Sequence, residues 1–128
     1  KETGVCKIAV FDGKGPENNT MKILPEQLKD LRVIQSGETW LDISAEGVNK
    51  GVALTFVQQK FGVDRSECAA FGDHMNDYEM LLACDHAYVT ENAFEGLKAL
   101  IGKTIPSNDD GGVLHALKNI LGGSCASK

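Results

Sequence analysis

The sequence predicts an α/β protein in which a parallel sheet with crossover helices follows a smaller α+β segment. Two observations predict this class. Helix and strand patterns alternate from residue 49 onward, as they do in sheets built from βαβ units. Residues 1–44 instead combine strand patterns with turn residues and one short helix pattern.

The first 44 residues are expected to form strands joined by a polar loop. The apolar stretch VCKIAVF is followed by the charged, Gly-rich stretch DGKGPENN, which is typical of a loop or linker but also of a simple turn. A short helix is predicted at PEQLKDL. RVIQSGETWLDIS then has apolar residues at every second or third position, which indicates strands.

The remaining sequence predicts helices and strands in regular alternation. Apolar Ala53, Val57 and Phe61 are spaced as on one helix face, and Gly62 predicts the helix end. The next elements, in order, are a CAAF strand, an NDYEMLLAC helix, an HAYVT strand, an NAFEGLKALI helix, a KTIP strand and a GGVLHALKNILGG helix.

Composition argues against several classes of protein. The 128 residues can bury one modest core, and 42% hydrophobic with 24% charged residues is typical of soluble globular proteins. No apolar stretch approaches the roughly 20 residues of a membrane span. The net charge is −5 and the positive charges are scattered, so we expect no nucleic-acid partner. The opening KETGVCKIAV lacks the features of a signal peptide and resembles the middle of a longer chain.

The cysteines are expected to be free thiols. Cys6, Cys68, Cys84 and Cys125 are far apart and form no CxxC pair, which argues against a zinc site. Cys68 lies in an apolar stretch and Cys84 ends an amphipathic one, where thiols serve as small core residues. We therefore expect a reduced, cytoplasmic protein.

Asparagine or aspartate precedes several predicted helices. Asn49, Asn76, Asn92 and Asn108 (or Asp109) can each accept a hydrogen bond from the free backbone N–H groups of the next helix. Capping alone would explain Asn92 and Asn108. In an open parallel sheet, however, these turns lie at the carboxyl ends of the strands, where such sheets bind ligands.

The stretch AAFGDHMNDYEMLLA concentrates oxygen ligands after a buried strand. Asp73 would lie just beyond the strand, where Gly72 permits a sharp turn. Mg²⁺ usually takes one or two carboxylates and fills its other positions with water and substrate phosphate. If Asn76 caps the next helix and Asp77 complements its dipole, two residues are explained without a ligand, but Asp73 is not.

Other metal sites fit poorly. The spacing of acidic and amide residues from 73 to 79 does not match an EF-hand loop. His74 is typical of an exposed loop, and His86 and His115 have no acidic or cysteine partners at metal spacing. We assign no chemistry to the histidines.

Lys50 stands in the first turn of its predicted helix, where the macrodipole disfavours a cation. An anion bound there would be attracted by the dipole, the free N–H groups and the ammonium, as phosphates are at helix N-termini. A solvated lysine that points away from the helix is the alternative.

These motifs together resemble the carboxyl-terminal part of a haloacid dehalogenase superfamily hydrolase, in the Cof-type, sugar-phosphatase-like branch. NKGVALTFVQQKFGV resembles the lysine motif of that branch, and AAFGDHMNDYEMLLAC resembles its acidic GDxxND motif. Similarity continues through VTENAFEGLKALI and SNDDGGVLHALKNIL, so it covers about residues 40–121. The resemblance implies a Rossmann-like core with an inserted α/β cap, and an Mg²⁺-dependent phosphatase that acts through an aspartyl-phosphate on a small phosphorylated metabolite such as a sugar phosphate.

The resemblance also implies roles for four residues. As catalytic residues, Asp73 would bind Mg²⁺, Asp77 would support that site without binding the metal directly, and Lys50 would neutralise the transferring phosphate. Asn76 would help to hold the phosphate or the loop. A divalent ion and an ammonium around a phosphoryl group both stabilise charge in the transition state.

One departure from the family pattern decides what the chain can do alone. The family's nucleophile lies in a DxD motif, and no DxD occurs in this chain. Asp12 follows the apolar IAVF, but DGK lacks the second aspartate, so Asp12 is not assigned that role. Thr90 and Glu91 stand where relatives usually carry Met and Gly, which leaves the contribution of Asn92 open. We expect a fragment that is inactive alone and has an open, apolar strand edge able to pair with another chain.

The expected domains are a partial α+β cap at 1–44, the carboxyl-terminal part of the core at 45–122 and a disordered tail at 123–128. An alternative function is a non-catalytic α/β module that binds a cation or a partner through its acidic edge. A phospho-receiver domain would share the parallel sheet but needs a lysine after a late strand, whereas Lys50 precedes Asp73.

Overall fold

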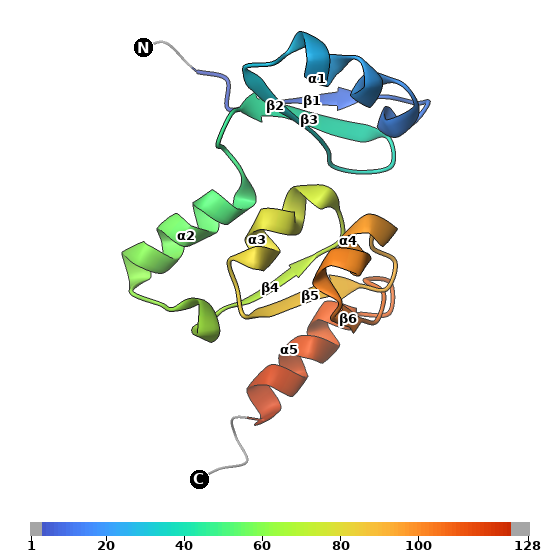
Figure 1. Ribbon diagram of the computed structural model, residues 1–128. Helices are drawn as coiled ribbons and strands as arrows, with labels where there is room; N and C mark the ends of the chain where they lie inside the picture. The colour runs from blue at the N-terminus through green and yellow to red at the C-terminus, as the bar shows by residue number, and fades with distance from the viewer. Residues whose placement is uncertain (1–3, 124–128) are drawn as a thin grey trace.

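The computed structural model describes residues 4–123, which form two halves, each built on its own three-stranded sheet (Figure 1). Residues 7–45 contain an antiparallel sheet, and residues 69–105 contain a parallel sheet with helices around it. Residues 46–49 connect the halves. The α/β class is confirmed. Within 4–123, no helix is both long and apolar enough to cross a membrane.

One face of the antiparallel sheet is apolar, and the other, termed the polar face, carries the charged side chains together with Phe11, Ile34 and Trp40. Its strands, in the order β1-β3-β2, are β1 (Lys7–Phe11), β2 (Leu31–Gln35) and β3 (Trp40–Ala45). Ser44 pairs with Lys7 on one side and with Arg32 on the other, so these three side chains share a face. Leu41 and Ile43 are buried on the opposite face.

The polar loop that follows β1 is folded around Asp12. The buried Asp12 carboxylate accepts hydrogen bonds from the Thr20 hydroxyl (2.7 Å), the Thr20 and Lys14 backbone N–H groups (both 3.1 Å) and the Asn19 amide (3.3 Å). The short turns of this region are η1 (Pro16–Asn18), η2 (Thr20–Lys22) and the single-turn α1 (Leu24–Gln27). DGKGPENN is therefore an anchored loop inside this half rather than a linker.

Asp12 should make the stability of the chain depend on pH in acid. Hydrogen bonding from Thr20 lowers the pKa of Asp12 from 3.8 to about 2. Because the folded pKa lies below the unfolded one, this stabilisation is present above about pH 4 and is lost as the pH falls through about 2. In Thr20→Val we expect the free energy of unfolding to fall less between about pH 4 and pH 2 than in wild type. Urea unfolding at several pH values measures this. An unchanged pH dependence in that variant would contradict the assignment.

The second half alternates helices and strands in the predicted order. Its elements are α2 (Lys50–Phe61), η3 (Arg65–Glu67), β4 (Ala69–Gly72), η4 (Met75–Asp77), α3 (Tyr78–Leu82), β5 (His86–Thr90), α4 (Glu95–Ile101), β6 (Thr104–Ile105) and α5 (Gly112–Gly123). The strands pair in the order β4-β5-β6, all parallel. No strand among residues 4–123 pairs with the outer edge of β4. The tail expected at 123–128 lies outside the described residues apart from Gly123.

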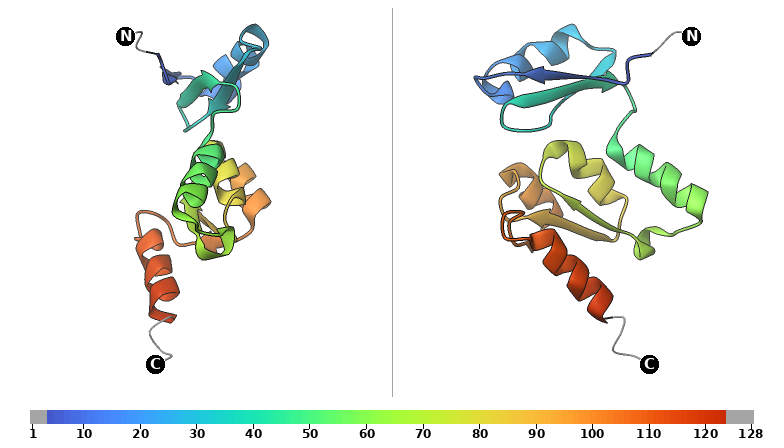
Figure 2. Two further views of the ribbon diagram at one scale, coloured as in Figure 1. Left: turned by 90° about the vertical axis from the view of Figure 1, so that its left-hand side faces the viewer. Right: turned by 180° about the vertical axis from the view of Figure 1, so that it is seen from behind.

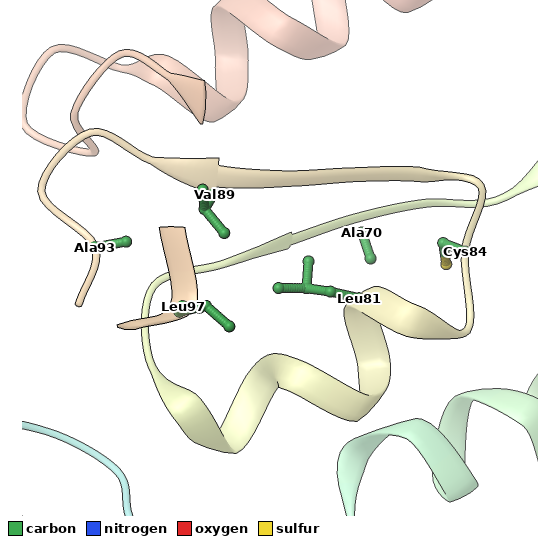
Figure 3. Packing of buried hydrophobic residues seen from close by; sticks show 6 residues of the cluster. All are labelled: Ala70, Leu81, Cys84, Val89, Ala93 and Leu97. Atoms are coloured by element: carbon green, nitrogen blue, oxygen red, sulfur yellow. The ribbon is translucent and has the colours of Figure 1, made fainter. Parts of the chain in front are cut away.

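The core of this half lies between the parallel sheet and the helices α3 and α4 (Figure 3). Ala70 on β4 and Val89 on β5 point towards Leu81 on α3 and Leu97 on α4. The buried Cys84 thiol joins this cluster, and burial raises its pKa. Helix α5 lies at the other face of the sheet (Figure 2). The cysteines Cys6, Cys68 and Cys84 are free, and Cys125 lies outside the described residues.

Helix α2 begins and ends as predicted, but it buries a different side. Asn49 caps it by accepting a hydrogen bond from the Val52 N–H (2.8 Å), and Gly62 ends it with φ of 64°. The apolar residues that predicted the helix stay outside the core, and Phe61 is 72% exposed. The helix packs on α3 through Gly51 instead, where a Cβ would lie 2.5 Å from the Glu79 carbonyl oxygen.

Candidate functional site

Lys50, Asp73 and Asp77 line one cavity of about 330 Å³ at the carboxyl ends of β4 and β5. Its other lining residues come from β4, α3, the end of β5, the loop after β6 and the start of α5: Phe71, Gly72, Met80, Thr90, Asn108 and Val113. Asp73 lies in the turn after the parallel strand β4, whereas Lys50 reaches the same cavity from the first turn of α2, which follows the antiparallel strand β3.

Asp77 organises the site from a buried position. It is only 4% exposed, and one of its carboxylate oxygens accepts a hydrogen bond from the Lys50 ammonium. The other oxygen lies 3.1 Å from the Asp73 backbone nitrogen and 3.4 Å from that of His74. A Cβ at Gly72 would come 2.6 Å from the Asp77 Cβ, so glycine is required for this close approach. Asp77 therefore fixes both Lys50 and the Asp73 loop.

The Lys50 ammonium is directed towards this aspartate rather than away from the helix. Its side chain is half exposed, so the ammonium can reach both Asp77 and the cavity. The ion pair with Asp77 offsets the unfavourable helix dipole at this position. The solvated lysine considered from sequence is not what the structure shows.

Asp73 presents an available carboxylate. Its backbone carbonyl accepts a hydrogen bond from the Phe94 N–H (2.8 Å), which holds the loop. Within residues 4–123, its carboxylate has no hydrogen bond or ion pair, and the residue is exposed. It is therefore free to take a ligand.

The residues present fit part of a magnesium site. In the described part of the chain, no three histidine, cysteine or acidic side chains gather closely enough to enclose a metal. Mg²⁺, however, commonly uses one or two carboxylates and keeps several waters, which Asp73 alone can begin to satisfy. The Thr90 hydroxyl adds a polar group to the same wall; it is buried and has no hydrogen-bond partner in residues 4–123.

Asn76 lies in a neighbouring cavity rather than beside Asp73. That cavity, of about 190 Å³, is shared with Lys50 and is walled by the polar face of the antiparallel sheet. Asn76 does not cap the following helix, so the capping prediction is wrong. The chain enters helical geometry one turn earlier, at η4, where the Asp77 carboxylate accepts from the His74 N–H (3.4 Å) and the Asp77 N–H donates to the His74 carbonyl (2.9 Å).

Asn92 and Asn108 do not cap helices either. Phe94 occupies the cap position of α4 and makes no side-chain cap. The Asn92 amide instead donates to the Asn108 side-chain oxygen, and the Asn108 N–H lies 3.3 Å from the Asn92 oxygen. This pair joins the loops that follow β5 and β6, and Asn108 reaches the cavity.

His74 is more constrained than its loop position suggested. Its Nδ1 lies 3.1 Å from the Gln35 carbonyl oxygen, and its ring stacks on Phe94 at 5.2 Å between centroids. It therefore forms one contact between the two halves of the chain. His86 contacts the Ser66 carbonyl at 3.1 Å, away from the site.

Comparison with known proteins identifies the family. The model of the haloacid dehalogenase-like hydrolase family matches residues 1–117. The chain belongs to this family. Its recognition from the sequence motifs, as a Cof-type member, is confirmed.

Several relatives of this haloacid dehalogenase-like hydrolase are named phosphatases. The chain is 32% identical over 96 residues to phosphatase YwpJ of Bacillus subtilis, covering 75% of this chain and 34% of the relative. It is 34% identical over 101 residues to the 5-amino-6-(5-phospho-D-ribitylamino)uracil phosphatase YbjI of Escherichia coli, covering 78% and 37%. A crystal structure of a Streptococcus mutans protein matches with a TM-score of 0.82 and 29% identity, covering 91% of this chain and 45% of that one. The chain thus spans less than half the length of these relatives.

Sequence reasoning missed two residues of this haloacid dehalogenase-like hydrolase. Thr90 ends β5 beside the Asp73 loop, and that position alone could have indicated it. Arg32 reaches from β2 to Glu79 on α3, with the two side chains 2.5 Å apart. No local sequence signal points to Arg32, because its partner is 47 residues away in the chain.

Proposed function

We propose that this chain supplies the cation-binding and phosphate-binding part of a phosphatase that hydrolyses small phosphate monoesters, such as sugar phosphates. The convergence of Lys50, Asp73 and Asp77 on one cavity carries this proposal. The names of the relatives support the same reaction class.

Each residue has a distinct role in the proposal. The Asp73 carboxylate would hold Mg²⁺, which when bound stabilises negative charge on the phosphoryl oxygens. Lys50 offers its ammonium to the phosphate, and Asp77 holds that ammonium and the Asp73 loop in place. Asn76, which shares the neighbouring cavity with Lys50, would donate its amide to the phosphate or its leaving group.

The first chemical step needs a group that these 128 residues do not contain. The bond from phosphorus to the leaving alcohol breaks as a carboxylate oxygen bonds to phosphorus, and the family's DxD nucleophile is not in this sequence. We propose that residues 1–44 are the later part of a cap, and that residues 45–122 are the carboxyl-terminal part of the core. A further strand would pair with the open edge of β4.

Cation binding tests the proposal on the chain itself. We expect wild type to bind Mn²⁺, used as a spectroscopic substitute for Mg²⁺, and Asp73→Asn to bind it at least about tenfold more weakly because the carboxylate is lost. Electron paramagnetic resonance of free Mn²⁺ measures this. Asp30→Asn removes an exposed aspartate of the other half and serves as the control. Equal affinity in wild type and Asp73→Asn would contradict the metal role.

A second candidate function is a non-catalytic module that binds a cation or a partner, and the absence of a DxD motif from the sequence favours it. Measurements of turnover distinguish the two candidates. We expect the isolated chain to hydrolyse no p-nitrophenyl phosphate in the presence of Mg²⁺. Detectable hydrolysis would show that a nucleophile lies within these residues. If the chain is part of a phosphatase, we expect phosphatase activity when it is joined to a segment that ends in DxD. If it is a non-catalytic module, we expect no activity in that fusion. The free thiols of Cys6, Cys68 and Cys84 are consistent with a cytoplasmic protein, which we also propose.

A further inference from the structure

Arg32 connects the two halves of the chain beside the candidate site. It lies on the polar face of the antiparallel sheet, and its side chain is 19% exposed. One guanidinium nitrogen lies 2.5 Å from the Glu79 carboxylate on α3. Another lies 3.4 Å from the Val48 carbonyl oxygen, in the segment that connects the halves.

These two partners flank the charged pair of the site. Val48 lies two residues before Lys50, and Glu79 lies two residues after Asp77. The first turns of α2 and α3 are also in contact, because Gly51 packs against the Glu79 carbonyl. A single guanidinium therefore fastens the segment that begins the Lys50 helix to the helix that follows Asp77.

The Glu79 carboxylate depends on Arg32 as its charged partner. Its second oxygen is buried and has no hydrogen-bond partner among residues 4–123. Arg32 is the cation that compensates this partly desolvated carboxylate. The Glu79 side chain as a whole is 34% exposed, so removing the guanidinium would let water replace it at the first carboxylate oxygen and would loosen the connection between Val48 and α3.

We infer that Arg32 is a positioning residue for Lys50. By fastening Val48 to Glu79 it holds the Lys50 ammonium against Asp77, so the placement of the antiparallel sheet and the geometry of the phosphate-binding amine are coupled. The inference rests on the proposed function only for the use made of that ammonium; the positioning itself is a property of the chain.

Arg65 provides a control with the same kinds of partner, although its side chain is more exposed (61%, against 19% for Arg32). Like Arg32, it bonds one carboxylate at 2.5 Å and one backbone carbonyl, through Asp85 and Leu82, but its partners lie away from Lys50, Asp73 and Asp77. We would compare Arg32→Met with Arg65→Met. The first readout is the ¹⁵N signal of the Lys50 ammonium, whose hydrogen exchange we expect to be slowed while it is paired with Asp77. The second is the affinity for inorganic phosphate.

We expect Arg32→Met to lose the slowly exchanging Lys50 signal and to bind phosphate about tenfold more weakly, as the loss of one charge-assisted contact would produce. Arg65→Met should leave both unchanged. The backbone amide signals of β4 and β5 show whether each variant is folded. If Arg32→Met is unfolded, Glu79→Gln tests the positioning role instead, because it removes the charge of the Glu79 carboxylate and keeps the shape of the side chain.

The outcomes separate this inference from the proposed function. An unchanged Lys50 signal in a folded Arg32→Met or Glu79→Gln variant overturns the positioning role. If wild type binds no phosphate but Arg32→Met still loses the Lys50 signal, the positioning role stands and the phosphate role of Lys50 fails. If phosphate binds to wild type and binding requires Lys50 but not Arg32, only the positioning role fails.

Discussion

Gly51→Ala is expected to destabilise the chain by about 3 kcal/mol. The added Cβ would lie 2.5 Å from the Glu79 carbonyl oxygen and 2.7 Å from the Glu79 Cβ, so the first turns of α2 and α3 would have to separate. Alanine would recover about 1 kcal/mol of helix propensity, which offsets only part of this cost. Urea unfolding followed by circular dichroism measures the change. We also expect weaker phosphate binding, because Lys50 is the adjacent residue.

Gly122→Ala is the control for the steric cause. Gly122 is the penultimate residue of α5, and nothing would come within 4 Å of an added Cβ. There the same substitution should leave stability unchanged or raise it by up to about 0.5 kcal/mol, because helix propensity acts only weakly at a helix end. If the two variants had similar stability, the contact between α2 and α3 at Gly51 would not be as close as described.

Asp77→Ala is expected to lower stability by about 3 kcal/mol and to reduce phosphate binding at least about tenfold. The carboxylate accepts hydrogen bonds from Lys50 and from the backbone N–H groups of Asp73 and His74. The half-exposed ammonium can regain water, so most of the cost comes from the loop N–H groups left without an acceptor. Chemical unfolding and phosphate titration measure the two effects.

Asp85→Ala tests whether burial causes the effect of Asp77→Ala. Asp85 also pairs with a cation, Arg65, but both side chains are exposed. Removing such a pair should cost about 0–1 kcal/mol. A loss in Asp85→Ala as large as that in Asp77→Ala would show that the buried position of Asp77 contributes little.

The order of elements could be predicted because its signals are local. Asn49 and Gly62 bracket α2 through backbone chemistry that depends only on neighbouring residues. The buried side of that helix could not be predicted. It depends on the approach of α3 to Gly51, and the apolar stripe that revealed the helix faces away from this contact.

The candidate site was predictable in part for the same reason. The sequence predicts a shared location for Lys50 and Asp73, and both line one cavity. The parallel sheet explains the position of Asp73 after β4, but Lys50 follows the antiparallel sheet, so strand order alone does not place it. The capping roles of Asn76 and Asn92 were wrong because the chain enters α3 through a 3-10 turn, and because the loop after β5 binds the loop after β6 instead. The contact of Arg32 with Glu79 depends on how two separately folded sheets are placed, which no local pattern encodes.

The hairpin that joins β2 and β3 has a further consequence for engineering and for natural variation. Its turn, residues 36–39, sets the pairing of Ser44 with Arg32. Inserting a single residue there and shifting the pairing by one would exchange the faces of β2, placing Val33 where Arg32 meets Glu79 and turning the guanidinium towards the apolar side. The turn at residues 36–39 contributes no charged group to the Lys50–Asp77 pair. Substitutions in this turn should therefore be tolerated better than insertions or deletions.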